Sequence, residues 1–552
     1  MSWTIIKNKG KICTCEVSIE GYRSRIVDNW MYLYNSEVNI ESDSKKTILV
    51  SGDYYIIRDE KRKYTKQLND IFEEKENPLE YIDGAYSVAA IFKDRIIVGA
   101  DIFKLYEVFY FCNSDVFCVG DDLMLIKKCV ELFIRGKACI NFDYMISYIA
   151  NRNIMNLFSP YKEIDLLYPG FELCYTDHVK IRRYWYPKRD IQYFAKHYEN
   201  HLLERTLDTY IKNVDKIALC YSAGLDSSVL KEYLEKKIDT VLLHVAKSGV
   251  GQIIDSDYNY VVSQANRNNL LIYREKYECR HIKGVPSPNI YYLINGYSKI
   301  YEDVSNEQKL SVFVDGNGGE LVFDPYYKNI GKGGLQYIIE NIRKCYASEN
   351  SLKVYAESKI IPYIAGDYIK IIEDALGNGD CTFIDPNVIQ EFNHRFREKM
   401  RVFFDEINNK FEMELLINIA YWWQLEKNKG CNIHFIYPYL NRNILFYNAI
   451  LSRKRKWNNS TRELQKYVCR EYLNDVILCR KTKGGGIIGI KNEIVKNRER
   501  YEYEMLESAL VKNKIVNYTK FIEAIDAFIA SKKYENIIGA VCCALWLNIE
   551  NY

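Results

Sequence analysis

The chain has 552 residues, of which 48% are hydrophobic and 27% are charged, and its formal net charge is +3. This length argues for more than one domain, and the apolar content is ample for large cores. A net charge so close to zero gives no electrostatic reason to expect a nucleic-acid or membrane partner.

The chain shows no sign of export or membrane insertion. The opening stretch MSWTIIKNKGKICTCEV lacks the apolar core of a signal peptide. The apolar run IIGAVCCALWL, from Ile537 to Leu547, is shorter than the ~20 residues of a membrane span. We therefore expect a cytoplasmic protein whose sixteen cysteines are mostly reduced. They form no CxxC pair, so no zinc site is expected, and Cys13 and Cys15 are interpreted as small core residues of one strand.

The first part of the chain is typical of short strands and turns. Residues 84–101 predict two strands joined at Lys93-Asp94, and residues 108–122 predict a second hairpin that turns at Asn113-Ser114. Residues 168–187 are also rich in strand formers. These patterns predict an antiparallel, sandwich-like domain over residues 1–190.

The pattern then changes to alternating helices and strands. Residues 200–214 have helical periodicity, while KIALCY, TVLLHVA and SVFVD are continuous apolar runs typical of buried parallel strands. One face of the helix after KIALCY is apolar, through Val229, Leu230, Tyr233 and Leu234. We predict a mainly parallel α/β sheet, then a mainly helical stretch from about Glu412, so that the second domain covers residues 191–552.

The stretch ALCYSAGLDSSVLKEYLEKK, from Ala218 to Lys237, joins a buried strand to an amphipathic helix. Its loop suits a phosphate group: Gly224 allows close approach, the serines donate hydrogen bonds, and a helix N-terminus follows. The carboxylate of Asp226 would repel phosphates unless a cation lies between them, and Mg²⁺ is the cation usually held by a carboxylate and substrate phosphates. The alternative is an ordinary helix cap, which needs only one such residue.

This loop resembles the PP-loop of the ATP pyrophosphatases, SGGxDS, and its Leu225 and double-serine form is most similar to the asparagine synthetase family. The resemblance implies that ATP and its pyrophosphate are bound by the loop residues, namely Ser222, Ala223, Gly224, Leu225, Ser227 and Ser228. Ala223 stands where the family has glycine, a change that is tolerable if the backbone angle there is ordinary.

A second glycine-rich loop, FVDGNGGELVF from Phe313 to Phe323, is similar to the family's strand followed by GxGxDE. The resemblance adds Gly316, Asn317, Gly318 and Gly319 to the pyrophosphate site, and makes Glu320 the second Mg²⁺ ligand beside Asp226. Asn317 stands where asparagine synthetases have glutamate, and Leu321 replaces a following acid. The alternative is a plain surface turn.

Further segments resemble the family in the same order. YPYLNRNILFYNAIL is similar to its PFLD segment, and YLNDVILCRKTKGGG to the segment that delivers an active-site lysine. The resemblance implies that Lys483 is catalytic, with Lys481 as the alternative, because an ammonium group suits developing negative charge. Taken alone, this run would be a solvated basic loop. Asp257 matches a family aspartate before a helix, whereas His244 is interpreted as a hydrogen-bonded core histidine.

The N-terminal part is similar to the family's glutaminase domain, an Ntn-type fold, through YIDGAYSVAAIF and GADIFKLYEVFYF. Ser2 occupies the place of the family's cysteine nucleophile, and Ile102 and Lys104 replace an arginine and a glycine. A serine nucleophile is chemically feasible, but nothing else in the opening stretch supports it. We therefore expect a retained scaffold without glutaminase activity.

The resemblance as a whole implies a glutaminase-like domain followed by a PP-loop synthetase domain with a helical C-terminal part. It implies an ATP- and Mg²⁺-dependent ligase that adenylates a carboxylate and forms an amide, most similar to the lasso-peptide cyclases and β-lactam synthetases that lack the glutaminase. Its substrate would be a small molecule or a precursor peptide with a carboxylate and an amine, with a leader-peptide-binding or protease partner. The alternatives are an asparagine synthetase that uses ammonia or glutamine and a catalytically inactive paralogue. A PP-loop tRNA-modifying enzyme would need a basic face, which the charge does not favour.

Overall fold

The computed structural model describes residues 2–8, 21–27, 30–35, 38–56, 68–151, 156–196, 202–212, 214–246, 257–266, 268–275, 287–288, 293–294, 297–323, 381–405, 407, 433–446, 448, 463–479, 488–531 and 536–550, with single residues between 412 and 423. Contacts divide the chain into two units, Met1–Met145 with Asn156–His197 and Ile146–Met155 with Tyr198–Tyr552. The sequence pattern predicts one boundary, at residue 190.

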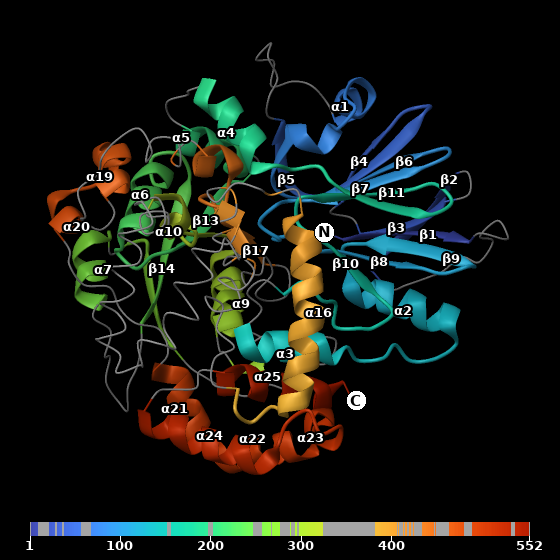
Figure 1. Ribbon diagram of the computed structural model, residues 1–552. Coiled ribbons are helices and arrows are strands. Elements are labelled where there is room, and N and C mark those ends of the chain that lie inside the picture. Colours follow the sequence, from blue (N-terminus) through green and yellow to red (C-terminus); the bar gives the residue numbers. More distant parts are fainter. Residues whose placement is uncertain are drawn as a thin grey trace, which may run out of the picture. The chain divides into compact units, whose positions relative to one another are not determined.

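The first unit contains two six-stranded antiparallel sheets, which Figure 1 shows as two layers. One sheet has the order β10-β8-β9-β1-β3-β2 and the other β12-β11-β7-β6-β5-β4. The elements are β1 (Trp3–Asn8), β2 (Arg23–Val27), β3 (Trp30–Tyr34), β4 (Asn39–Ser42), β5 (Lys46–Ile56), α1 (Leu68–Glu74), η1 (Pro78–Tyr81), β6 (Ile82–Phe92), β7 (Ile96–Ala100), β8 (Val108–Cys112), β9 (Val116–Gly120), α2 (Leu123–Ile134), β10 (Asp165–Leu167), β11 (Phe171–Tyr175), β12 (Val179–Arg183) and α4 (Pro187–Lys196). The helix α3 (Phe142–Asn151) begins in the first unit, and its residues from Ile146 on belong to the second.

Contacts between inner faces hold these two sheets together. The indole Nε1 of Trp3 on β1 donates to the hydroxyl of Ser87 on β6, at 3.1 Å. The rings of Phe117 on β9 and Tyr175 on β11 stack with centroids 4.0 Å apart. Both predicted hairpins are confirmed, since β6 pairs with β7 and β8 with β9, each antiparallel across the expected turn. The first unit therefore has the sandwich-like architecture that the strand pattern predicts.

The second unit is built on a five-stranded, wholly parallel sheet with the order β15-β14-β13-β16-β17. Its first elements are α5 (Leu202–Ile211), β13 (Lys216–Cys220), α6 (Leu225–Leu234), β14 (Asp239–Ala246), α7 (Tyr258–Gln264), β15 (Leu270–Arg274), α9 (Tyr297–Gln308), β16 (Val312–Asp315) and α10 (Gly319–Phe323). The later elements are α16 (Pro386–Phe404), β17 (His434–Ile436), α19 (Glu463–Val468), η4 (Arg470–Tyr472), α20 (Asp475–Cys479), α21 (Ile488–Lys496), α22 (Arg498–Glu507), α23 (Ala509–Lys512), α24 (Tyr518–Ser531) and α25 (Asn536–Ile549).

The helices cover this sheet with apolar faces. The predicted face of α6, which contains Val229 and Leu230, is buried in one core with Ile217 and Leu219 of β13. On α9, Tyr301 contacts the rings of both Phe313 and Phe435, which lie on neighbouring strands. These contacts fix the parallel strands that the apolar runs predict.

The described part of the chain after Glu412 is mainly helical, as predicted, but it also contains the strand β17, which the sequence does not predict. Its three residues, His434–Ile436, pair in parallel with β16 and complete the sheet. A strand this short and buried has no periodicity to separate it from a helix.

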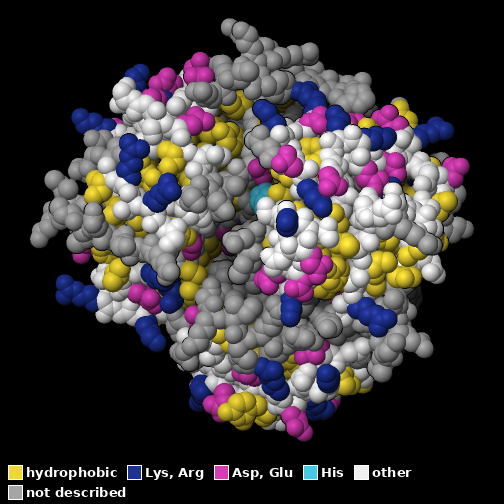
Figure 2. Space-filling view, turned by 180° about the vertical axis from the view of Figure 1, so that it is seen from behind, with side chains coloured by type: hydrophobic (Ala, Val, Ile, Leu, Met, Phe, Trp, Pro, Cys, Tyr) yellow, Lys and Arg dark blue, Asp and Glu magenta, His cyan; other side chains and the backbone are white. Residues whose placement is uncertain are grey.

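The described helices and the charged surface residues can be compared with the composition of the chain. No helix in the described part of the chain is long and apolar enough to cross a bilayer. Even α25, which is buried along nearly all its length, has only 14 residues. On the face shown in Figure 2, the described Lys and Arg side chains are interspersed with Asp and Glu, as a net charge of +3 leads one to expect.

Candidate active site

The order of the strands singles out one edge of the parallel sheet. From β13 the chain adds β14 and β15 on one side, and then returns to add β16 and β17 on the other. Ligands of open α/β sheets bind beyond the carboxyl ends of the strands at such a reversal. The two predicted loops, in residues 222–228 and 313–323, follow β13 and β16, the strands that flank this reversal. In the structure, the segments between strand and helix are residues 221–224 and 316–318. The last residues of the two strands, Cys220 and Asp315, lie side by side in the sheet.

The start of the first loop is held by β14. The backbone N–H of Tyr221 donates to the carbonyl of Leu243, and Nδ1 of His244 lies 2.9 Å from the carbonyl of Tyr221. Because a carbonyl only accepts, the proton of this histidine must be on Nδ1. His244 is buried, as expected for a hydrogen-bonded core histidine. Its contact fixes the direction in which the loop leaves the strand.

The backbone angle at Ala223 is not ordinary. Its φ is +51°, in the left-handed region, and its side chain is fully buried. The condition for alanine to be tolerable at this position is therefore not met, and the angle gives a physical reason for the glycine of the PP-loop motif. The next residue, Gly224, has an extended conformation and is the N-terminal cap of α6.

The serines of the loop contact one another and the helix start. The backbone N–H of Ser222 donates to the hydroxyl of Ser227 at 3.3 Å, and their two hydroxyls lie 3.4 Å apart. Ser222 is exposed, whereas Ser227 and Ser228 are buried in the first turn of α6, which begins at Leu225. The first N–H groups of a helix have no acceptor within it, so this end of α6 offers donors and a positive dipole to an anion.

Asp226 lies where the two loops meet. Its Oδ1 accepts a hydrogen bond from Nε2 of Gln465 at 2.8 Å, and its backbone carbonyl accepts one from the hydroxyl of Tyr439 at 2.9 Å. A Cβ added at Gly319 would lie 1.9 Å from Asp226 Oδ1, and one added at Gly316 would lie 3.2 Å from the Asp226 Cβ. The glycines therefore let the second loop approach this carboxylate closely.

The second loop is stabilised by its own side chains. The carboxylate of Asp315 accepts hydrogen bonds from the backbone N–H and the side-chain amide of Asn317, both at 3.0 Å. Gly318 has a φ of +94°, and a Cβ there would lie 2.6 Å from Leu440. Leu321, at the position of a family acid, is a buried core residue. Asn317 thus closes the loop.

Some residues selected from the sequence lie wholly or partly outside the described part of the chain. The backbone of Glu320 lies in α10, but its side chain is outside the described part. Lys481 and Lys483 lie outside the described residues altogether, as do Cys13 and Cys15. Asp257 is buried and stands at the N-terminal end of α7.

Three residues that the sequence motifs do not mark as site residues form hydrogen bonds to Asp226 or within the second loop: Asp315, Tyr439 and Gln465. Asp315 could have been noticed, because it ends a buried strand. Gln465 lies 239 positions from Asp226, and no motif marks it.

Asp226 could supply one ligand to a metal ion at this site. No group of three or more His, Cys, Asp or Glu side chains that could hold a metal occurs among the described residues. Magnesium needs no such group, because it usually binds one or two protein carboxylates and completes its shell with phosphates and water. The carboxylate of Asp226 could therefore hold Mg²⁺ together with a phosphate, which the helix N-terminus favours.

In the first unit, the residues that depart from the glutaminase motif are buried in a tight turn. The carboxylate of Asp101 accepts hydrogen bonds from the backbone N–H groups of Phe103, Leu105 and Tyr106. Lys104, inside this turn, has a φ of +57° and donates to the carbonyl of Asn156. The turn therefore keeps a left-handed residue where the motif has glycine.

Comparisons with known proteins add little to this geometry. No family model matches the chain, and no curated protein matches its sequence. One similar solved structure is described as the allosteric regulatory enzyme of purine biosynthesis, with 9% identity over 57% of this chain and 83% of that one, and a TM-score of 0.21. Another is the glutamine phosphoribosylpyrophosphate amidotransferase from B. subtilis, with 10% identity over 58% and 86% of the two chains and a TM-score of 0.21. At TM-scores this low, neither likeness indicates a function, so a function can be inferred only from the geometry of the site.

Proposed function

We propose that the chain is an ATP-dependent, AMP-forming ligase that converts a carboxylate into an amide. The observation that carries the proposal is the position of Asp226. This carboxylate lies in the first turn of a helix that follows a central parallel strand at the reversal of strand order, and a second glycine loop approaches it closely. A helix N-terminus suits phosphates, and a carboxylate among them requires a cation.

The proposed reaction has two steps. The substrate carboxylate attacks the α-phosphorus of ATP, which forms an acyl-adenylate and releases pyrophosphate. An amine then attacks the acyl carbon, loses a proton, and displaces AMP. Bound Mg²⁺ would neutralise phosphate charge, and Asp226 with Glu320 would hold it. The chain itself would align the phosphates through the N–H groups and hydroxyls of residues 222–228, and Lys483 would stabilise developing negative charge.

Within this class we favour a peptide macrolactam cyclase of the lasso-peptide kind, in which the amine comes from the substrate. The proposal follows from the resemblance and from Ser2 at the cysteine position. Asn317 in place of the glutamate of asparagine synthetases also favours a different branch of the family, and its side-chain amide donates a hydrogen bond to Asp315 within the second loop. Amide formation with an intramolecular amine, with free ammonia and with glutamine would distinguish these sources of nitrogen.

The test is exchange of pyrophosphate into ATP, driven by a panel of carboxylates that includes peptides with a free amine. We expect Asp226→Asn to abolish the exchange and AMP release while the protein stays folded, since a lost metal ligand removes several kcal/mol of charge stabilisation. Asp239→Asn, at the opposite end of the sheet on an exposed residue, is the control and should exchange normally. Near-normal exchange by folded Asp226→Asn would show that the loop is only a helix cap.

A further inference from the structure

Gln465 connects α19 to the proposed phosphate loop through a partly buried hydrogen bond. Its side chain is fully buried, and its Nε2 lies 2.8 Å from Oδ1 of Asp226. Asp226 lies in α6, and the hydrogen bond joins two residues that are 239 positions apart in the sequence. Because a carboxylate only accepts, the chemistry itself requires the amide nitrogen to face Asp226.

The chemical kind of the donor matters as much as its position. An amide carries no charge, so it orients the carboxylate without neutralising it. A lysine or arginine at the same place would form an ion pair and compete with a bound cation. Gln465 therefore orients this carboxylate without adding a positive charge that would compete with a bound cation.

Steric contact limits the same carboxylate from another side. A Cβ at Gly319 would lie 1.9 Å from Oδ1 of Asp226, so the oxygen that accepts from Gln465 also lies close to the start of α10, with no room for a side chain between them. The two contacts come from different elements and constrain one oxygen. A side chain held in this way loses little further freedom when it binds an ion.

We propose that Gln465 is a positioning residue, which holds the carboxylate of Asp226 in the orientation that binds the divalent cation of the nucleotide. This inference depends on the proposed function, since it assigns a role to a second residue of the same site. Groups that orient metal ligands typically change metal affinity by ~10–100-fold when they are removed.

The competing interpretation is that the bond merely attaches α19 to α6. The chain offers a matched control for it. The hydroxyl of Tyr439, also fully buried, donates to Asp226 as well, but to its backbone carbonyl and not to its carboxylate, at 2.9 Å. Tyr439→Phe therefore removes a partly buried hydrogen bond to the same residue and leaves the carboxylate with its amide donor.

The experiment measures binding and needs no turnover. Calorimetric titration of the full chain with α,β-methylene ATP, repeated over a series of Mg²⁺ concentrations, gives the Mg²⁺ concentration at half-maximal affinity. We expect Gln465→Met to raise this concentration by ~10–100-fold while affinity at saturating Mg²⁺ stays close to wild type. Tyr439→Phe should lower the thermal midpoint but leave the Mg²⁺ requirement within about twofold of wild type.

Two further variants make each outcome decisive. Gln465→Asn, which withdraws the amide by one methylene yet keeps a polar group, replaces Gln465→Met if that variant does not fold. Asp226→Asn separates this inference from the proposed function. If Asp226→Asn binds the analogue with the wild-type Mg²⁺ dependence, the proposed nucleotide site is wrong. If Asp226→Asn loses that dependence while neither Gln465 variant changes it, or if Tyr439→Phe changes it equally, Gln465 is only a structural link.

Discussion

Two residues, Ala223 and Lys104, adopt left-handed backbone angles at positions where the family motifs have glycine. Their φ angles are +51° and +57°. The left-handed conformation costs a non-glycine residue about 1–2 kcal/mol. At Lys104 the side chain offsets this cost, because its Nζ donates to Asn156 and lies 2.8 Å from Glu107. At Ala223 the gain is limited to a buried methyl group, so the strain there should be measurable.

We predict that Ala223→Gly changes the free energy of unfolding by less than about 1 kcal/mol, because relief of strain offsets the lost methyl group and the freer unfolded chain. The matched control is Ala218→Gly, equally buried but on the regular strand β13. Without strain to relieve, it should cost roughly 1.5–2 kcal/mol. Urea unfolding of both variants tests this. Equal losses would contradict a left-handed angle at Ala223.

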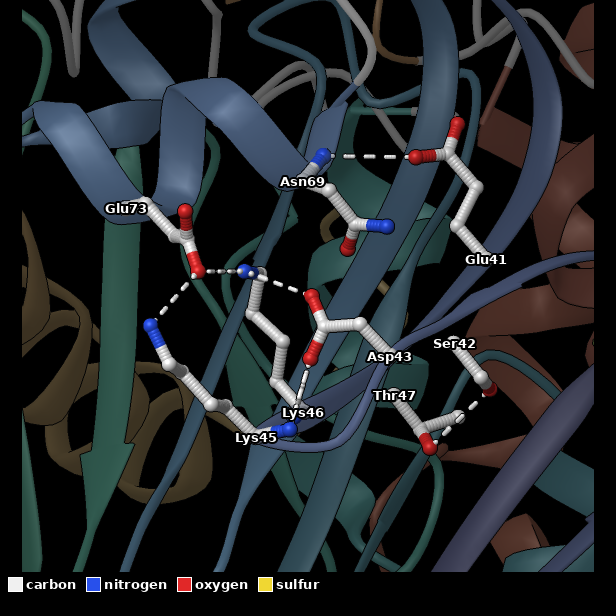
Figure 3. Close-up of polar contacts among 8 residues, drawn as sticks. All are labelled: Glu41, Ser42, Asp43, Lys45, Lys46, Thr47, Asn69 and Glu73. Carbon is white, nitrogen blue, oxygen red and sulfur yellow. Dashed lines mark hydrogen bonds and ion pairs between the residues drawn. The ribbon is translucent and has the colours of Figure 1, made fainter.

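At the scale of elements, a buried lysine ties the β4–β5 hairpin to α1 (Figure 3). Nζ of Lys46 lies 3.0 Å from Asp43 in the turn and 3.1 Å from Glu73 on the helix, and its side chain has no exposed surface. Hydrogen bonds from the backbone of Lys45 and from Lys46 lower the pKa of Asp43, and the same lysines lower the pKa of Glu73. In addition, the backbone N–H of Asn69 on α1 donates a hydrogen bond to the carboxylate of Glu41 on β4.

We expect Lys46→Met to destabilise the first unit by about 1–2 kcal/mol, the size of a hydrogen bond to a charged group. Lys45→Met is the control: Lys45 approaches the same Glu73 at 3.5 Å, but its side chain is 76% exposed, so its loss should cost less than about 0.5 kcal/mol. Both carboxyl pKa values are lowered, so the stabilisation is complete above pH ~4 and is lost as pH falls through the folded-state values. Denaturation at neutral and acidic pH should show the two variants converging in acid, and a constant gap would contradict the ion-pair explanation.

At the scale of the whole molecule, the sequence predicts what repeated local patterns encode. The hairpins at 84–101 and 108–122, the strand KIALCY and the helix after it all follow from alternation, apolar runs and turn residues. What escapes prediction depends on long-range contact. The three residues of β17 become a strand because β16 lies beside them, and Gln465 reaches Asp226 because α19 folds against α10. The left-handed angle of Ala223 likewise comes from the sheet and helix that it connects, not from its own preference.

The free energy of unfolding should vary with pH in part because of one carboxyl group, that of Asp121, which follows β9. Its oxygens accept hydrogen bonds from the backbone N–H of Trp3 at 2.7 Å and from the hydroxyl of Ser87 at 2.6 Å. It therefore links β1 to β6 of the facing sheet. Burial raises its pKa to about 6, more than these bonds lower it, and the neighbouring charge of Asp122 adds to the rise.

Because the folded chain keeps this proton to a higher pH than the unfolded chain does, the free energy of unfolding falls as pH rises from about 4 to 6 and is then level. The contribution is at most ~3 kcal/mol, and less to the extent that water reaches the partly exposed side chain. Asp121→Asn cannot titrate, so its stability relative to wild type should rise over that window by a similar amount. Urea unfolding at half-unit steps of pH, followed by tryptophan fluorescence, measures the difference. The control is Asp115→Asn, a change of an exposed turn residue, whose free energy of unfolding should differ from wild type by a nearly constant amount at every pH. If the difference between Asp121→Asn and wild type is equally constant, Asp121 has the same pKa in the folded and unfolded chain and the prediction is wrong.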